Sequence, residues 1–550
     1  MKPEELLHII HPLQQAGRFD GTPGRLVIDS REVRKNDVFL ALRGTRSDGH
    51  AYIREAVRKG AGVIIAEHIP DAHSSGTRSS KTIHPEENVW YLQVADTRSI
   101  AGELAQAFAD YPAKSMKMVG ITGTNGKTTV STLVYQVLVK LGYHAGLLGT
   151  VETRIGDKVL PSRLTTPDSV TIADILRQMV EVDTAFAIME VSSHALEQQR
   201  TGGIRFDVAG FTNISQDHLD YHRDMASYIE AKKRLFVTLD ENAVSVVNRD
   251  DPASWKVTDG CRADTWSFGF ESDRDFRILD ERSDGMVLDL DGTIVSTPLT
   301  GRYNAYNVAQ AYLICLALGC PQYSVAGALG DATGAPGRLE RVTAGGLREA
   351  ETPKEANGQK PAEAGGDSAG EAEMEPGASV ETTPQPVVFV DYAHTPDALE
   401  NVLRTLDNVR SRKETLHVVF GCGGDRDRTK RAEMGRIADR YADVVTLTSD
   451  NPRTEEPDAI IRDIRGGIVR SEHLYIEPRR RKAIRSAILD ADTRTIVLIA
   501  GKGHETYQEV HGRRHKFDDR EIAAKALAEW IDRRLSGKRK RARKTGGEVS

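Results

Sequence analysis

The feature that most constrains the fold is a glycine-rich loop between an apolar segment and a segment of helical period. The loop reads Gly120-Ile-Thr-Gly-Thr-Asn-Gly-Lys-Thr-Thr129, and the apolar run 116–122 leads into it. Beyond the loop, apolar residues recur at positions 130, 133, 134, 137, 138 and 141, which is one face of a helix. A strand, a glycine loop and a helix in this order predict a phosphate-binding loop, because backbone N–H groups and the helix N-terminus favour an anion.

Within this loop, Lys127 is placed to reach the β- and γ-phosphates of a nucleotide, and Thr128 to bind Mg²⁺ through its hydroxyl. The spacing departs from the common motif, since Ile occupies position 121 and Gly123 supplies the first tight glycine. GTPases, motors and ligases all use such a loop, so the loop alone does not identify the reaction.

Length and composition restrict the class of protein. The chain has 550 residues, which predicts two to four domains. No apolar run approaches the roughly 20 residues of a membrane span, and the N-terminal segment lacks the pattern of a signal peptide. The four cysteines show no metal-binding spacing. We therefore expect a cytoplasmic protein with reduced thiols and no membrane partner.

Apolar runs alternate with segments of helical period along most of the chain. Runs such as 62–66, 186–190, 387–390 and 496–500 are typical of strands buried on both faces. Strands alternating with helices predict an α/β protein with parallel sheets. Proline and glycine turns near Pro112 and Gly334–Gly337 suggest three domains, at residues 1–113, 114–338 and 339–550.

Two segments have extreme charge. Residues 349–386 hold nine acidic and two basic residues and no aromatic, so we expect a disordered insert. The C-terminal tail, residues 537–550, contains six basic residues within Lys538–Lys544. A basic tail can bind nucleic acid, but no folded basic face accompanies this one, so we interpret it as a solvated terminus and expect no nucleic-acid partner.

Seven ordered motifs resemble those of the Mur ligases, the ATP-dependent enzymes that form amide bonds in peptidoglycan precursors. The motifs are the loop 123–129, Glu190–Leu196, Asn213–Asp220, Gly301–Asn307, Asp391–Asp397, Gly421–Asp427 and Gly501–Glu505. The similarity runs from Asp29-Ser-Arg31 to Phe517–Arg520, nearly the whole chain. It implies a UDP-binding N-terminal domain, a central P-loop ATPase domain and a Rossmann-like C-terminal domain.

The family reaction transfers the γ-phosphoryl group of ATP to a carboxylate, and an amine then attacks the acyl phosphate. The resemblance implies Mg²⁺ bound by Thr128, Glu190, His218 and a carbamylated Lys232, with Lys127, Glu190, His218 and Lys232 as the catalytic residues. Taken alone, Glu190 could be a surface or capping carboxylate and His218 a core histidine. Lys232 has Lys233 beside it, so its assignment rests on a spacing of 14 residues from His218.

The resemblance also implies three sets of binding residues. The ATP set is Gly123, Thr124, Asn125, Gly126, Lys127, Thr128, Thr129, Asn304, Arg338 and Asp391. The set for UDP-MurNAc-L-Ala-D-Glu is Ile28, Ser30, Thr45, Arg46, Ser47, Thr165, Thr166, Ser192, Gln198 and Arg200. The set for the amino-acid substrate is Arg426, Asp450, Asn451, Pro452, Arg453, Gly501 and Glu505.

The motif Asp450-Asn-Pro-Arg453 resembles that of family members that add meso-diaminopimelate to the D-Glu γ-carboxylate. The planar guanidinium of Arg453 suits the additional carboxylate of this substrate. L-Lysine would leave a buried guanidinium unpaired, so we expect discrimination of roughly 10³-fold or more.

Three alternatives stay open: an L-lysine-adding Mur ligase, a folylpolyglutamate synthase, and a nucleotide-binding regulatory protein. For the favoured reaction the partners are small molecules, and we expect a monomer.

Overall fold

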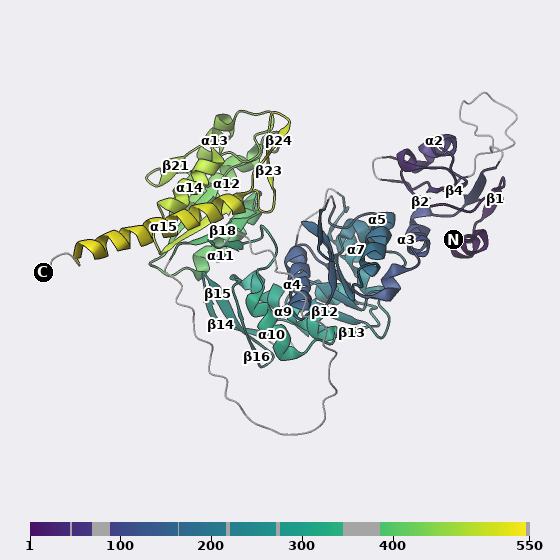
Figure 1. The fold of residues 1–550 in the computed structure, drawn as a ribbon, viewed down its shortest axis with the longest axis horizontal. Coiled ribbons are helices and arrows are strands. Elements are labelled where there is room, and N and C mark those ends of the chain that lie inside the picture. Colours follow the sequence, from purple (N-terminus) through teal and green to yellow (C-terminus); the bar gives the residue numbers. More distant parts are fainter. Residues whose placement is uncertain are drawn as a thin grey trace, which may run out of the picture. The chain divides into compact units, whose positions relative to one another are not determined.

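The computed structural model describes residues 1–44, 47–68, 88–162, 164–215, 221–270, 276–344 and 385–545, with side chains as far as residue 536 (Figure 1). The expected site residues Thr45, Arg46 and His218 lie outside these ranges, as do residues 349–384 of the acidic insert. The described chain forms two compact units. One comprises residues 1–280, 286–298 and 302–334, and the other comprises residues 281–285, 299–301 and 335–550. The domain borders expected after residues 113 and 338 stay predictions.

The first unit begins with a five-stranded sheet in the order β1-β5-β4-β3-β2. Its strands are parallel apart from β1, which pairs antiparallel with β5. The elements are α1 (Pro3–Ile10), β1 (Gln14–Ala16), β2 (Leu26–Val27), η1 (Ser30–Glu32), β3 (Val38–Leu40), η2 (Gly49–Tyr52), α2 (Ile53–Arg58), β4 (Val63–Ala66), β5 (Trp90–Gln93), α3 (Thr97–Phe108) and η3 (Pro112–Ser115).

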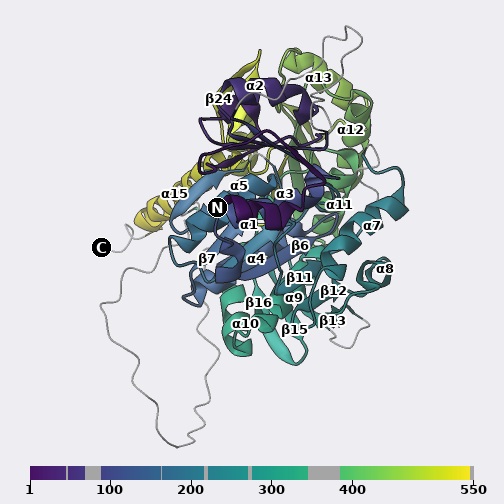
Figure 2. The ribbon, with the colours of Figure 1, turned by 90° about the vertical axis from the view of Figure 1, so that its right-hand side faces the viewer.

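An eight-stranded sheet follows, in the order β13-β12-β11-β6-β10-β7-β8-β9, and Figure 2 shows its middle strands side by side. Strands β13 to β7 of this order are parallel, whereas β8 and β9 form an antiparallel edge. Its elements are β6 (Lys117–Thr122), α4 (Lys127–Lys140), β7 (Ala145–Leu148), β8 (Glu152–Ile155), β9 (Lys158–Pro161), α5 (Ser169–Val180), β10 (Phe186–Glu190), α6 (Ser193–Glu197), β11 (Val208–Phe211), α7 (Met225–Val237), β12 (Val244–Asn248), α8 (Ser254–Thr258) and β13 (Asp264–Phe268).

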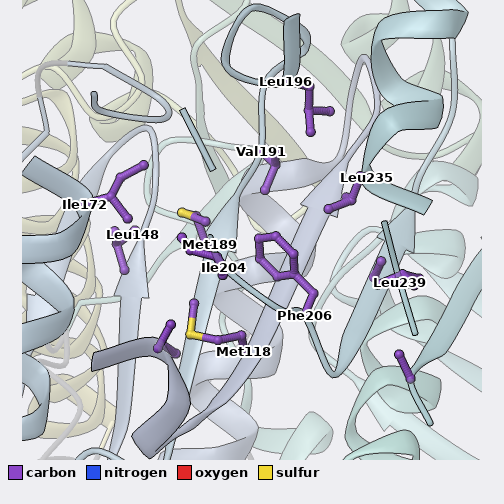
Figure 3. Packing of buried hydrophobic residues seen from close by; sticks show 14 of the residues in the cluster. Met118, Leu148, Ile172, Met189, Val191, Leu196, Ile204, Phe206, Leu235 and Leu239 are labelled. Atoms are coloured by element: carbon purple, nitrogen blue, oxygen red, sulfur yellow. The ribbon is translucent and has the colours of Figure 1, made fainter. Parts of the chain in front are cut away.

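The strand and helix expected around the glycine loop are confirmed as β6 and α4. All five residues of β10 are buried, as the apolar run 186–190 predicts. Side chains of β6, β7 and β10 pack against α5, α6 and α7, and Figure 3 shows Met118, Leu148 and Met189 among Ile172 and Leu235. This packing fixes the ends of the strands from which the glycine loop and Glu190 emerge.

A three-stranded sheet and two helices complete this part of the chain: β14 (Phe276–Arg282), β15 (Gly285–Leu290), β16 (Thr293–Thr297), α9 (Arg302–Ala317) and α10 (Gln322–Asp331). Helix α9 packs against α4 and β12. It carries the expected site residue Asn304, which is hydrogen-bonded to Asn307, and the Asn307 side chain lies against Gly126 of the glycine loop.

The second unit contains a six-stranded sheet in the order β17-β18-β22-β19-β20-β21, parallel except for β17. Apolar clusters cover both of its faces. The elements are β17 (Glu340–Val342), β18 (Val387–Asp391), α11 (Pro396–Val409), β19 (Thr415–Phe420), α12 (Thr429–Tyr441), β20 (Val444–Leu447), α13 (Pro457–Arg465), β21 (Leu474–Ile476), α14 (Arg480–Leu489), β22 (Thr495–Ala500), β23 (Tyr507–Val510), β24 (Arg513–Lys516) and α15 (Asp519–Thr545).

The last helix, α15, continues through the basic run 538–544 (Figure 1), and the expectation that this run is a solvated terminus stays a prediction. Lysine and arginine have high helix propensity, so a helix already begun at Asp519 extends at little cost. Among the described residues, no helix is both long and apolar enough to cross a membrane.

A buried ion pair links α14 to α15. Arg480 and Asp519 are paired at 2.6 Å with both side chains 0% exposed, and Arg480 also donates to the carbonyl of Ala500 at 3.0 Å. Replacing Arg480 with Ala would leave a buried carboxylate without its partner. We expect Arg480→Ala to lower the free energy of unfolding of the second unit by about 3–5 kcal/mol.

The measurement is the urea midpoint followed by fluorescence of Trp530, which is buried in α15, in a background in which Trp90, Trp255 and Trp266 of the first unit are replaced with Phe. The control is Arg485→Ala, which removes the exposed pair with Glu529 on the same two helices and should cost about 1 kcal/mol or less. Equal shifts in the two variants would contradict the assignment.

Candidate functional site

The glycine loop is held in a conformation that only glycine tolerates at two positions. Gly123 has φ +147° and Gly126 has φ +87°. A Cβ at Gly123 would overlap the Thr212 hydroxyl, and one at Gly126 would lie 2.5 Å from Asn307 Oδ1. The end of β11 and helix α9 therefore close on the loop from two sides, which fixes the direction of its N–H groups.

The loop side chains expected to bind ATP are brought together. Lys127 Nζ donates to the carbonyls of Gly123 and Thr124 at 3.0 and 2.9 Å, so it lies folded over the loop. Asn125 donates from its backbone N–H to Asn213 Oδ1 at 3.1 Å. Thr129 is buried in the first turn of α4.

Glu190 lies at the carboxyl end of β10 with its side chain fully buried. Its carboxylate accepts hydrogen bonds from the Thr128 hydroxyl at 2.9 Å and from the Thr150 amide and hydroxyl at 2.7 and 2.8 Å. Within the described part of the chain, no lysine or arginine pairs with this carboxylate. Sequence reasoning missed Thr150, although it follows β7, and adjacent parallel strands end at the same edge.

This arrangement fits the Mg²⁺ that the resemblance implies. A buried carboxylate without a cationic partner is costly, and a divalent cation would offset that cost. The ligands present are oxygens from a carboxylate and hydroxyl groups, which Mg²⁺ prefers. In the described residues, no three His, Cys, Asp or Glu side chains cluster as metal ligands. Thr128 and Glu190 would therefore hold the ion together with water or phosphate oxygens.

The two adjacent lysines of α7 face different surroundings. Lys232 is 1% exposed, and its Nζ donates to the carbonyl of Gly123 at 2.8 Å and lies 4.4 Å from the centre of the Tyr228 ring. Lys233 instead pairs with Asp259 at 2.5 Å, where Asp259 is 74% exposed. Lys232 is thus the lysine that reaches the glycine loop.

The five residues expected around the muramoyl peptide lie close to Glu190. The hydroxyl groups of Thr165 and Thr150 are 3.1 Å apart, within hydrogen-bond distance, and Thr166 donates to the carbonyl of Glu190 at 2.8 Å. The other three residues are connected to Thr166. Ser192 donates from its backbone N–H to the Thr166 hydroxyl at 3.0 Å. Arg200 donates to the Thr166 carbonyl at 2.7 Å and to the Gln198 side chain at 2.8 Å.

Burial lowers the pKa of Arg200. Its hydrogen bonds go to the Thr166 carbonyl and to the Gln198 side chain, both neutral groups, so this guanidinium is suited to take an anionic ligand.

The expected uridine-binding residues are only partly described. Ser30 is buried in η1 and donates to Glu55 Oε2 at 3.1 Å, while Ser47 donates to the Tyr52 hydroxyl at 3.2 Å. Ile28 is half-buried and packs against the core of the first sheet. Ile28 and Ser30 follow β2, whereas Ser47 lies in the loop after β3.

The remaining expected ATP residues divide between the two units. Asn304 accepts from Asn307 at 3.0 Å beside the glycine loop in the first unit. Arg338 and Asp391 belong to the second unit, where Asp391 accepts from the backbone N–H groups of Leu339 and Ala393 at 2.6 and 2.7 Å. Complete burial raises the pKa of Asp391, an effect that nearby Arg338 opposes.

The residues expected to bind the amino-acid substrate gather in the second unit. Asn451 donates to Glu505 Oε2 at 2.9 Å, and Lys502 donates to both Asn451 and Glu505 at 3.0 and 3.1 Å. A Cβ at Gly501 would lie 2.5 Å from Asp450 Oδ2. Lys502, which is fully buried here, was not among the residues assigned to the pocket from sequence.

Glycines also let the loop 421–427 lie against the loop 450–453. A Cβ at Gly424 would overlap the carbonyl of Pro452, and one at Gly423 would lie 3.0 Å from Arg453 Nη1. Arg453 Nη1 donates to the Gly424 carbonyl at 2.7 Å. Arg426, on the same glycine loop, is exposed and has no ion pair within the described residues.

The expectation that Arg453 is buried and would be left unpaired by lysine is wrong. Its side chain is 23% exposed, and it already has the Gly424 carbonyl as an acceptor and Glu509 at 3.8 Å. When lysine binds in place of diaminopimelate, this guanidinium lacks a substrate carboxylate but still has the Gly424 carbonyl and Glu509 as partners. Discrimination against lysine should be weaker than the roughly 10³-fold that a buried orphan charge would give.

Comparison with known proteins identifies the class. Three family models match in order: the Mur ligase family catalytic domain over residues 25–109, the Mur ligase middle domain over 121–315, and the Mur ligase glutamate ligase domain over 378–503. The chain belongs to the Mur ligase family, and its α/β fold has the three domains of that family.

Two relatives named UDP-N-acetylmuramoyl-L-alanyl-D-glutamate–2,6-diaminopimelate ligase resemble the chain over almost its full length. The protein from Cytophaga hutchinsonii is 37% identical over 96% of this chain and 99% of its own. The protein from Geobacter metallireducens is 38% identical over 96% of this chain and 99% of its own.

Solved structures agree with this assignment of fold. A structure of a protein with the same name as these two relatives has a TM-score of 0.67 and 29% identity, covering 96% of this chain and 99% of its own. The MurF ligase from Thermotoga maritima in complex with ADP has a TM-score of 0.51 and 18% identity, covering 93% and 98%, and shares the fold.

The geometry of the glycine loop gives a direct prediction. A side chain at Gly123 must displace Thr212, so Gly123→Ala should reduce ATP binding at least tenfold, measured by calorimetry with a non-hydrolysable analogue. The control is Gly327→Ala in α10, where nothing lies within 4 Å of the added Cβ. Unchanged nucleotide affinity in Gly123→Ala would contradict the assigned loop.

Proposed function

We propose that this protein is an ATP-dependent, ADP-forming ligase that joins meso-diaminopimelate to the D-Glu γ-carboxylate of UDP-MurNAc-L-Ala-D-Glu. The observation that carries the proposal is the cluster of polar side chains around loop 450–453, where Arg453 and Glu505 offer one cationic and one anionic partner to an amino-acid substrate. The names of the full-length relatives support the same reaction. We further propose that the enzyme is a monomer that acts in the cytoplasm, where ATP and these small-molecule substrates are found.

Different groups of residues bind the different substrates of this reaction. The glycine loop and Lys127 bind the polyphosphate, whose charge they neutralise. Arg200 and the hydroxyl groups of Thr165, Thr166 and Ser192 hold the peptide of the nucleotide-sugar substrate so that its carboxylate is aligned with the γ-phosphate. Mg²⁺, held by Thr128 and Glu190, would supply charge neutralisation during phosphoryl transfer.

The γ-phosphoryl group passes to the D-Glu carboxylate, releasing ADP and giving an acyl phosphate. A neutral amine of diaminopimelate then attacks the acyl carbon, the C–N bond forms, and inorganic phosphate leaves. In the pocket, Arg453 pairs with a carboxylate of the amino acid, and Glu505 accepts from its remote ammonium group.

The test is phosphate release from ATP in the presence of UDP-MurNAc-L-Ala-D-Glu and either diaminopimelate or lysine. We expect release with diaminopimelate to exceed release with lysine. Arg453→Ala should raise the KM for diaminopimelate about tenfold or more and leave the KM for ATP unchanged, because it removes one charge-assisted pair.

Several outcomes of the same assay would favour the alternatives. Preference for lysine would favour a lysine-adding Mur ligase. Release only with a folate and glutamate would favour a folylpolyglutamate synthase, and no release with any acceptor would favour a regulatory protein.

We also propose that Lys232 is carbamylated in the active enzyme. Its uncharged Nζ would attack CO₂, forming the C–N bond and losing one proton, and the resulting carbamate would be an anion beside the metal site. The position of Lys232 supports this step, because its buried Nζ lies 2.8 Å from the Gly123 carbonyl of the phosphate loop. The carbamate nitrogen keeps one N–H, which can still donate to the Gly123 carbonyl.

The expected result is a carbamate carbon signal in the ¹³C NMR spectrum of enzyme incubated with ¹³C-bicarbonate. Lys232→Ala should lose this signal, whereas Lys233→Ala should retain it. Fully active enzyme without the signal would contradict the carbamate while leaving the ligase activity itself unaffected.

A further inference from the structure

Hairpin β23–β24 is tied to the loop that carries Arg453. Gln508 donates from its side chain to the carbonyl of Asp450 at 2.6 Å, and Glu509 donates from its backbone N–H to Asn451 Oδ1 at 2.9 Å. The hairpin therefore contacts the two residues that lead into the Asn-Pro-Arg turn. Neither Gln508 nor Glu509 belongs to the pocket inferred above.

The hairpin also fixes the backbone of Arg453 itself. Arg453 donates to the carbonyl of Glu509 at 3.1 Å and accepts from the N–H of His511 at 2.6 Å. Its φ of +51° lies in the left-handed region, which is strained for a residue with a Cβ. Such a conformation persists where the surroundings impose it, and these two bonds impose it here.

The side chain of Glu509 faces Arg453 although its own hairpin offers another cation. In the register of β23 and β24, Glu509 stands opposite Arg514. The Arg514 guanidinium instead lies 4.2 Å from the centre of the Tyr507 ring. Glu509 Oε2 lies 3.8 Å from Arg453 Nε, with the two side chains 24% and 23% exposed. This charge is therefore directed at the guanidinium expected to recognise the substrate.

We propose that Glu509 is a positioning residue that sets the orientation of the Arg453 guanidinium and thereby the preference for diaminopimelate over lysine. The guanidinium is held at two points, by the Gly424 carbonyl at Nη1 and by Glu509 at Nε. These contacts leave Nη2 available for a substrate carboxylate. The inference rests on the proposed function, since it concerns the same amino-acid pocket.

A long arginine side chain anchored at one point samples several orientations, and binding the carboxylate must then restrict it. Neutralising Glu509 should therefore weaken recognition of the second carboxylate without affecting catalysis. Glu509→Gln keeps the shape and backbone bonds of the hairpin and removes only the charge.

We expect Glu509→Gln to raise the KM for diaminopimelate about 2- to 5-fold, the range of a partly exposed ion pair. The kcat at saturating diaminopimelate and the KM for ATP should stay within the error of the wild type. The kcat/KM for lysine should also be unchanged, so the ratio of the two efficiencies falls. A general loss of structure would instead lower kcat and would lower kcat/KM with both amino acids together.

Two controls isolate the interaction. Glu521→Gln makes the same chemical change at a carboxylate that faces Lys516 at 3.9 Å, and its kinetics should match the wild type. In an Arg453→Ala background, Glu509→Gln should have no further effect on the KM for diaminopimelate, because the group it positions is absent.

An unchanged or lowered KM for diaminopimelate, an equal loss with lysine, or a full effect in the Arg453→Ala background would each overturn the role of Glu509. These results would leave the proposed function standing as long as Arg453→Ala alone impairs use of diaminopimelate. Absence of any diaminopimelate-dependent phosphate release from the wild type would overturn the proposed function and this inference with it.

Discussion

The buried carboxylate of Glu190 is the constraint on which the first unit depends. It receives hydrogen bonds from Thr128 in α4 and from Thr150 after β7, so three elements meet at one fully buried charge. Within the described residues, no basic side chain balances it. The fold tolerates this cost because the position lies at the carboxyl edge of a parallel sheet, where a cation and a polyphosphate can supply the missing charge.

In both units, glycines allow two segments of backbone to lie close together at the binding residues. Gly123 and Gly126 let β11 and α9 contact the phosphate loop, and Gly423 and Gly424 let one loop of the second unit lie against Arg453. In each case a Cβ would occupy the space of a neighbouring polar group. The binding residues are thus positioned by backbone contacts, and single methyl groups should be enough to disrupt them.

The second unit positions its recognition residues by polar contacts between loops and a hairpin. Lys502 joins Asn451 to Glu505, and hairpin β23–β24 holds the strained backbone at Arg453. The same hairpin supplies Glu509, whose carboxylate lies 3.8 Å from Arg453 Nε and orients the guanidinium. Discrimination between amino-acid substrates therefore depends on partly exposed charges. Such charges contribute less binding free energy than a buried charge that the wrong substrate would leave unpaired.

The sequence alone determined the alternation of strands and helices, the phosphate loop and the family, because periodicity and motif order are local properties of the chain. It also directed attention to Lys232, but only the tertiary structure separated Lys232 from Lys233, since the two face opposite surroundings on α7. Thr150 and Glu509 were not predicted, Lys502 was not assigned to the amino-acid substrate, and the burial of Arg453 was overestimated. Each of these depends on contacts between segments far apart in the chain, and only packing brings such segments together.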